Sequence, residues 1–249
     1  MLFSNSQRPA PRSSAKDAFT LTELLVVIAI ISILCALLLP TLASSKEQGK
    51  RAQCISNERQ LTLAAQMYWD ENDDVSFPYL AGATNGGKVY WFGWIKAGAE
   101  GERDFDPTFG AIYPYLAERG VEICPSLDYR STVYKLKAKG AAYGYGYNRL
   151  LGGKSLRQVR NLSATALFAD SAQVNDFQSP ASPENPMLEE FYYFDDQAES
   201  ATVHFRHRRK ANVSFCDGHI SPESPEPNSL DTRLAGETIG RLPPMIVVP

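Results

Sequence analysis

Residues 19–39 read FTLTELLVVIAIISILCALLL, and this stretch decides how the chain is organised. It is almost wholly apolar and is followed directly by Pro40. A helix needs roughly 20 apolar residues to cross the hydrocarbon core of a bilayer, so the stretch is long enough to span a membrane. It carries one charged residue, Glu23. A carboxylate inside a membrane segment is costly and normally has a partner, so Glu23 is a candidate functional residue.

Three interpretations of this segment compete. The simplest is a plain signal anchor. A cleaved secretory signal would use residues 41–43 (TLA) as its cleavage site, but the apolar run exceeds the typical length of about 7–15 residues and Glu23 is out of place in it. A lipoprotein signal is disfavoured because Leu34, which precedes Cys35, is not small. The third interpretation rests on the order of residues around Glu23.

Residues 18–31 read AFTLTELLVVIAII and resemble the N-terminal signature of type IV pilins and type II secretion pseudopilins. The resemblance implies that a prepilin peptidase cuts between Ala18 and Phe19 on the cytoplasmic side and methylates the new amine of Phe19. Ala18 stands where this family usually has Gly. The resemblance also implies that Glu23 acts in assembly, and that Pro40 occupies a position where family members often carry a helix-kinking proline.

Physical chemistry gives Glu23 a reason to be there. Cleavage before Phe19 would create an α-amine at the cytoplasmic edge of the span, and Glu23 of a neighbouring subunit would pair with it. An unpaired carboxylate in hydrocarbon is penalised, so this pairing would favour assembly in register. The alternative is that Glu23 reaches the headgroups, since it lies about one helical turn inside the span.

The composition narrows the class of protein. The 249 residues accommodate one membrane span and one soluble domain, and a net charge of −3 gives no footprint of nucleic-acid binding. No GxGxxG, P-loop or paired CxxC motif is present. The leader contains Arg8, Arg12 and Lys16, and long domains translocate largely regardless of charge. We therefore expect a single-pass protein of a bacterial inner membrane, with a cytoplasmic N-terminus and a periplasmic head that assembly extracts into a filament.

The chain divides into five expected segments, and the expected fold is α+β and pilin-like. One long N-terminal helix, with a membrane half and an amphipathic half, would pack on a small antiparallel sheet head. The amphipathic half would have Glu58 on its polar face and would end at the NDD run of residues 72–74. The segments are a cytoplasmic leader removed on processing (1–18), a transmembrane and filament-core helix (19–40), its amphipathic continuation (41–75), a periplasmic head (76–222) and an extended, weakly ordered Pro-rich tail (223–249).

A second motif lies near the C-terminus. His207 is followed by nine residues and then Asp217-Gly218, which resembles the prepilin processing-associated domain named for its His-x9-Asp-Gly motif. Residues 212–216 alternate like a strand, and Asp-Gly predicts a hairpin turn. Residues 202–205 would form the neighbouring strand, with His207 bonded to a backbone carbonyl and Asp217 to turn amides. A metal-binding or catalytic role for these residues is the alternative.

Residues 51–61 and 123–126 also resemble a subgroup of pilin-like proteins. That resemblance implies a disulfide between Cys54 and Cys124, because both lie in elements shared with the subgroup. With Cys216, three cysteines lie outside the span, so at least one must remain unpaired. The alternative is that all three are buried thiols. Some related major pseudopilins hold calcium in the head, although the acids here lack EF-hand spacing. The candidate calcium ligands are Asp170, Asp195, Asp196 and Asp217.

The sequence therefore predicts a structural subunit that is not an enzyme. It would be a pseudopilin, assembled into a type II secretion-like pseudopilus or a type IV pilus-like filament. Its expected partners are prepilin peptidase, other pilin or pseudopilin subunits, the inner membrane and a secretion-system assembly platform. The alternative is a membrane-anchored extracytoplasmic domain that binds a ligand such as a glycan through head aromatics, for example Trp91 and Trp94. An enzyme that uses His207 and Asp217 ranks third.

Overall fold

The computed structural model describes residues 20–117, 121–140 and 143–249. These form two units, divided between Lys46 and Glu47, and each unit is described by itself. Helix α1 (Leu21–Glu71) begins in the first unit and ends in the second. Its bounds confirm the single long helix predicted for the N-terminal third of the described chain.

The first unit is an isolated apolar stretch of α1. Its large side chains are exposed, from 44% at Val27 to 80% at Leu21. Within the described residues, α1 is the one helix long and apolar enough to cross a membrane. The helix continues through Pro40, which cannot donate to the carbonyl one turn earlier, and Thr41 Oγ1 donates to Leu38 O at 2.8 Å beside it.

The second half of α1 is amphipathic and forms one wall of the head. Its buried residues recur at helical spacing, so one face turns to the interior. These residues are Cys54, Asn57, Glu58, Leu61, Thr62, Ala64, Ala65 and Trp69. The helix ends where Asp74 N donates to Trp69 O at 3.0 Å, with Asp73 and Asp74 at φ 54° and 60°.

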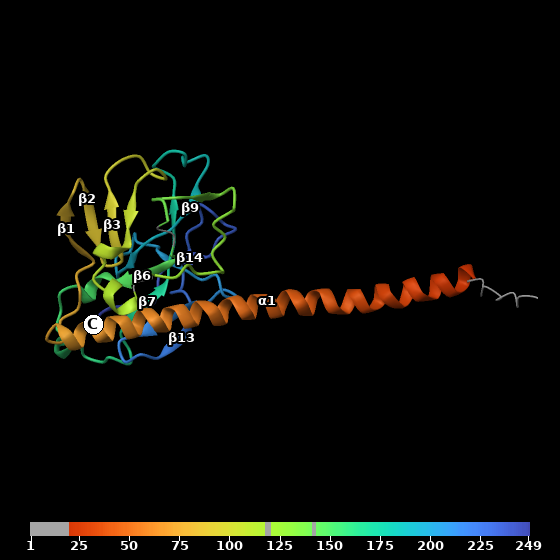
Figure 1. Ribbon diagram of the computed structural model, residues 1–249, viewed down its shortest axis with the longest axis horizontal. Helices are drawn as coiled ribbons and strands as arrows, with labels where there is room; N and C mark the ends of the chain where they lie inside the picture. The colour runs from red at the N-terminus through yellow and green to blue at the C-terminus, as the bar shows by residue number, and fades with distance from the viewer. Residues whose placement is uncertain (1–19, 118–120, 141–142) are drawn as a thin grey trace, which may run out of the picture. The chain divides into compact units, whose positions relative to one another are not determined.

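Within the described residues, the strands of the head form four sheets, several of whose strands are labelled in Figure 1. The first is antiparallel, β1 (Leu80–Thr84), β2 (Gly87–Tyr90), β3 (Gly93–Lys96) and β4 (Phe105–Asp106). The second has the order β10 (Tyr193–Phe194), β6 (Tyr145–Asn148), β7 (Ala166–Asp170), β12 (Ala211–Phe215) and β13 (Ile220–Glu223), with only β10 and β6 parallel. The third is β5 (Tyr134–Lys135), β9 (Met187–Glu189) and β8 (Gln173–Asn175), and the fourth is β11 (Val203–His204) with β14 (Ile239–Gly240).

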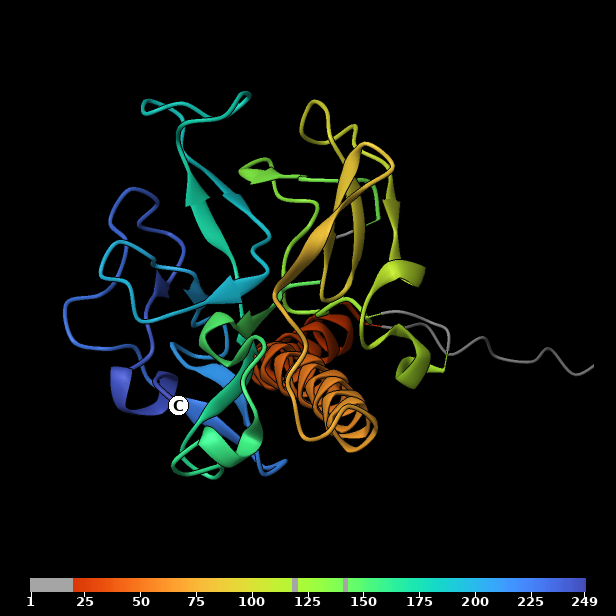
Figure 2. The same cartoon turned by 90° about the vertical axis from the view of Figure 1, so that its left-hand side faces the viewer.

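Short helices connect these strands. They are η1 (Pro107–Phe109), η2 (Tyr113–Leu116), η3 (Arg149–Leu151), η4 (Leu156–Gln158) and the C-terminal α2 (Pro244–Val247). Figure 2 shows the β1–β3 strands and the β8–β9 strands as two separate arms above the C-terminal half of α1.

The core lies between α1 and the five-stranded sheet. Every residue of β7 and β12 is buried, so these two strands are the centre of the head. Aromatic rings fill the space beside them, with Phe77 4.6 Å from Tyr147 and Trp91 5.2 Å from Phe168 between ring centroids. Trp91 is 1% exposed and its indole N–H donates to Tyr192 O at 2.9 Å. The α+β prediction is therefore confirmed.

Two expectations for the C-terminal region were wrong. The strand near residues 202–205 is β11, and it pairs with β14 instead of β12, because β12 already has β7 and β13 on its two edges. The segment after residue 223 is not an extended tail. Its apolar residues Ile239, Leu242 and Val247 are at most 3% exposed, and their burial attaches it to the head.

Candidate functional site

Glu23 lies in the first turn of α1 and is bonded to Thr20. Its carboxylate Oε2 accepts from Thr20 N at 2.8 Å and from Thr20 Oγ1 at 2.7 Å, while Glu23 N donates to Thr20 Oγ1 at 3.2 Å. This reciprocal arrangement is a capping box, which satisfies the first free amides of a helix. The carboxylate of a single chain is thus hydrogen-bonded, contrary to the expectation of a wholly unpaired group. Ala18 and Phe19 lie outside the described residues.

The predicted cysteine pair is brought together inside the head. Cys54 projects from α1 and Cys124 from the loop after residue 121, and both are 0% exposed. Their sulfur atoms lie 2.6 Å apart, and all four cysteines of the chain are free thiols in this structure. Residues 70 positions apart therefore meet at one point, where the head joins the helix.

His207 of the His-x9-Asp-Gly motif lies at the same point. A ring nitrogen of His207 and the two sulfur atoms all lie within 4.8 Å of one another. On its other side His207 Nε2 is 3.3 Å from Asp170 Oδ2, an ion-pair distance. The expected backbone carbonyl partner is thus replaced by a buried carboxylate at the end of β7.

Asp170 organises the charges around this cluster. It is 0% exposed, and its oxygens accept from Arg206 Nη2 at 2.8 Å and from Asn212 N at 2.7 Å. Burial opposes its ionisation, but the charge of Arg206 and the His207 bond hold the pKa of Asp170 below its usual value. Desolvation likewise opposes protonation of His207, and the bonds to Asp170 and Cys124 outweigh it and raise the pKa of His207 to about 9.

The two thiols are polarised in opposite directions. The hydrogen bond with Cys124, followed by burial, raises the pKa of Cys54. Burial opposes ionisation of Cys124, but the bond from Cys54 and the positive charge of Arg206 lower the pKa of Cys124 well below its ordinary value. Cys124 is therefore the sulfur that would carry the negative charge. Arg206 and His207 are thus the groups that would stabilise a thiolate on Cys124, and a thiolate is the nucleophile in disulfide formation.

Glu58 also lies in this region, and its predicted position on the polar face of the helix was wrong. It is completely buried on α1, one turn after Cys54, where its Oε1 accepts from Ser214 N of β12 at 3.1 Å. Burial, with the nearby charge of Asp170, raises the pKa of Glu58 well above its usual value. A protonated carboxyl can be buried at far lower cost than a carboxylate. The sequence signal was Glu58 itself, because it stands where Leu is usual in the pilin-like proteins that residues 51–61 resemble.

The geometry of the cysteine pair fits a bond better than a metal ion. In a tetrahedral zinc site each sulfur lies about 2.3 Å from the metal, which places two sulfurs about 3.8 Å apart. The separation here is 2.6 Å, so no metal fits between them as they stand. In the described part of the chain, Cys54, Cys124 and His207 are the one group of three or more His, Cys, Asp or Glu ligand atoms close enough to hold an ion.

The four acids expected to bind calcium have other partners, and that of Asp196 is Gln197, whose Nε2 donates to Asp196 Oδ1 at 3.5 Å. Asp170 is held by Arg206 and Asn212, and Asp195 Oδ2 lies 2.6 Å from Arg149 Nη2. Asp217 accepts from His219 N at 3.1 Å, within the predicted turn between β12 and β13, where Gly218 has φ 99°. Among the described residues no three of these acids are grouped around one point. Calcium binding stays a prediction, and calorimetry on the purified chain would test it.

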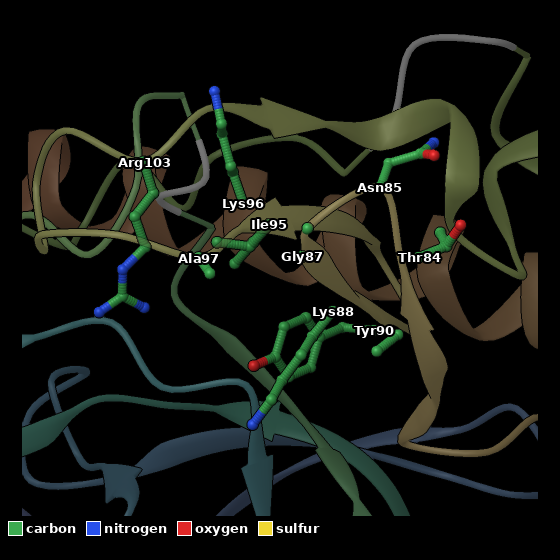
Figure 3. Close-up of a pocket in the computed structure, with 11 residues that line it drawn as sticks. Thr84, Asn85, Gly87, Lys88, Tyr90, Ile95, Lys96, Ala97 and Arg103 are labelled. Atoms are coloured by element: carbon green, nitrogen blue, oxygen red, sulfur yellow. The ribbon is translucent and has the colours of Figure 1, made fainter.

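A cavity of about 570 Å³ lies on the first sheet (Figure 3), and the indole N–H of Trp94 donates to the lining residue Thr84 O at 2.8 Å. Tyr90, Ile95 and Ala97 contribute apolar surface. Figure 3 shows Lys88 and Tyr90 extending to one side of the sheet, whereas Lys96 extends away from them. Lys96 and the lining residue Arg103 are both partly neutralised, by Asp104 at 3.3 Å and by Glu100 at 2.6 Å.

A buried ionic cluster lies beside this cavity, and no motif in the sequence predicted it. Lys135 of β5 bonds to Glu100 and, at 2.8 Å, to Glu189 of β9. Lys137 Nζ is 3.0 Å from the other Glu189 oxygen. Burial opposes ionisation, but the Lys137 charge and the hydrogen bonds from both lysines lower the pKa of Glu189. The cluster ties the loop around Glu100 to the third sheet, which is a structural role.

Comparison with known families concerns the N-terminal region alone. A model described as the prokaryotic N-terminal methylation motif matches residues 13–39. The match includes Ala18, Phe19 and Glu23, and it supports a pilin-like signature at the start of the chain. A search of curated proteins found no match. A search of solved structures found none either.

Proposed function

We propose that this chain is the precursor of a pseudopilin, a structural subunit that prepilin peptidase processes between Ala18 and Phe19. The observation that carries the proposal is the methylation motif at residues 13–39, followed by a helix long and apolar enough to span a membrane. The mature subunit is anchored in the inner membrane with its head in the periplasm. It assembles with other subunits into a type II secretion-like pseudopilus or a type IV pilus-like filament.

The capping box means that Glu23 would exchange one partner for another on assembly: Thr20 of its own chain for the amine of a neighbouring subunit. In a single chain Thr20 hydrogen-bonds the carboxylate but does not neutralise its charge. In a filament, the methylated amine of Phe19 on a neighbouring subunit supplies the opposite charge. Because charge neutralisation is worth more in hydrocarbon than a hydrogen bond alone, assembly is favoured over the isolated helix.

The test of this function is the intact mass and N-terminal sequence of the protein purified from its native membrane. A chain that begins at N-methylated Phe19 is expected. Glu23→Gln, which keeps the Thr20 bonds and removes the charge, is expected to be processed but not assembled. A native chain that begins at Met1 would reduce the protein to a plain membrane anchor, and a start at Ser44 would indicate ordinary secretion.

We also propose that Cys54 and Cys124 form a disulfide in the periplasmic protein. The buried sulfurs 2.6 Å apart and the lowered pKa of Cys124 support it. A periplasmic disulfide oxidant would accept the two electrons and two protons as the sulfur–sulfur bond forms. The bond would fix α1 to the head.

A second candidate function is ligand binding by the head, and the cavity on the first sheet is the observation that favours it. Its volume of about 570 Å³ lies in the range of small-molecule sites. Titration of the full chain with an acidic oligosaccharide distinguishes the two functions. Binding that Lys88→Glu removes, in a protein that does not assemble, would favour the ligand-binding function.

A further inference from the structure

The head carries two exposed charged surfaces of opposite sign. The basic turn comprises Arg208, Arg209 and Lys210, all exposed. The acidic end of α1 comprises Asp70, Glu71, Asp73 and Asp74, of which only Asp74 has an ion-pair partner among the described residues. That partner is Arg157, at 3.3 Å and 83% exposed. Neither surface is used by the cysteine cluster or the membrane segment.

The basic turn is built in a conformation that its residues disfavour. His207 N donates to Lys210 O at 3.0 Å and Lys210 N donates to His207 O at 3.2 Å, which closes a two-residue turn. Its central residues, Arg208 and Arg209, have φ 56° and 63°. Turns with positive φ at both central positions favour Asn and Gly, because a Cβ is crowded there. Two long cationic side chains are thus held at a site where glycine would be less strained.

The acidic end of α1 is electrostatically unfavourable in the isolated chain. The C-terminus of a helix carries a partial negative charge, so basic side chains are favoured there and acidic ones are not. The last turn of α1 has no basic residue, and it holds Asp70 and Glu71. Asp73 and Asp74 follow with positive φ. A cationic partner from outside the chain would relieve both the helix dipole and the mutual repulsion of these acids.

The two surfaces lie at different positions along α1. The basic turn is fixed beside residues 51–54 of the helix, because a ring nitrogen of His207 lies within 4.8 Å of Cys54 Sγ and because Arg51 Nε donates to Asn212 Oδ1 at 3.2 Å. At 1.5 Å per residue, Glu71 lies about 25 Å further along the helix than Cys54. Figure 1 shows β13, the partner of β12, beside the part of α1 that packs on the head, before the C-terminal end of the helix.

We propose that the basic turn of one copy binds the acidic end of α1 of a second copy. The contact uses two different surfaces, so it is heterologous, and a heterologous contact that does not close into a ring propagates as an open helical filament. This inference rests on the proposed function and adds to it the surfaces through which neighbouring heads meet. Both surfaces are exposed, so added salt should screen the contact.

Glycine substitution separates assembly from folding. Arg209→Gly and Asp73→Gly each remove one charge at a position of positive φ, so each is expected to keep or raise the melting temperature of the head. Each is also expected to lower the amount of full-chain polymer pelleted from detergent-extracted membranes about tenfold at low salt. Asn85→Gly is the matched control, because Asn85 has φ 50° and no charge. It should leave the pelleted fraction unchanged.

Charge exchange tests the pairing directly. Arg209→Asp and Asp73→Arg are each expected to weaken pelleting, and the chain that carries both substitutions is expected to recover it. Wild-type pelleting in both glycine variants, or a double exchange no better than the single ones, would overturn the inference while leaving the pilin-like function intact. A wild-type chain that begins at Phe19 and never pellets would contradict both proposals.

Discussion

Removal of the proposed Cys54–Cys124 disulfide should lower the stability of the head by an amount that depends on how far apart the two residues are in the sequence. The two residues are 70 positions apart, and closing a loop of that length in the unfolded chain corresponds to about 4 kcal/mol of stability. For a unit of this size, each kcal/mol shifts the melting temperature by about 2–4 °C, so the expected loss is roughly 8–16 °C. The variant for the measurement is Cys54→Ala with Cys124→Ala.

Tryptophan fluorescence reports this unfolding selectively. All three tryptophans of the chain, Trp69, Trp91 and Trp94, lie in the second unit, and the first two are at most 2% exposed. The wild type is melted with and without dithiothreitol, and reductant is expected to lower its melting temperature to near that of the double variant. The double variant itself should not respond to reductant. Cys216→Ala is the control, because it removes a buried thiol and leaves the bond in place.

Counting the free thiols tests directly whether Cys54 and Cys124 are bonded. Under denaturing, non-reducing conditions, iodoacetamide should label Cys35 and Cys216 only, and a linked peptide should contain Cys54 and Cys124. The disulfide proposal would be refuted if all four cysteines of protein isolated from the periplasmic side were labelled and if reductant did not change the melting temperature. Bound zinc at one ion per chain would also refute it, since a metal would then hold the sulfurs.

Three further perturbations test the buried groups. Glu58→Gln keeps an acceptor for Ser214 N, so it should change the free energy of unfolding by less than about 1 kcal/mol. Glu58→Ala removes this acceptor and should lower the free energy of unfolding by about 2–4 kcal/mol. Guanidinium titration measures both. In the reduced protein the pKa of His207 is raised to about 9, so its contribution to stability should be complete below about pH 6.5 and be lost as the pH rises through 9. Melting temperatures measured across this range with dithiothreitol should therefore fall less steeply in His207→Gln. Val247→Ala should cost about 1–3 kcal/mol because Val247 is fully buried, whereas Met245→Ala, at a residue 81% exposed, should change nothing measurable by the same titration.

The long helix was predictable because its evidence is local. An apolar run, helical spacing of the buried residues and a polar stop sequence all lie within residues 19–74, and α1 follows them closely. The turn at Asp217-Gly218 was predictable for the same reason. The β11–β14 pair was not, since it joins Val203 to Gly240 across a segment with no regular strand pattern.

The buried cluster was only half predictable. Cys54 and Cys124 were identified through resemblance, whereas Asp170 was assigned to calcium and Glu58 to the solvent side of the helix. Periodicity treats a carboxylate as an exposed residue, because burial of a charge is usually too costly. That cost is avoided here by neighbours distant in sequence, and Arg206 and Ser214 become visible as partners only once the chain is folded.

These distant partners also explain how α1 is fixed against the head. Apolar packing alone tolerates a helix that slides or rotates slightly, because dispersion contacts are not directional. One turn of α1 instead buries three polar groups, which meet two different segments. Cys54 meets Cys124 and Asn57 Nδ2 donates to the neighbouring Ile123 O at 3.2 Å, whereas Glu58 accepts from β12. Any shift of the helix would leave a buried polar group without its partner, at a cost of about 1–3 kcal/mol each. The register between helix and head is therefore set by directional bonds, so a subunit positioned through its helix would present its head surfaces in a defined orientation.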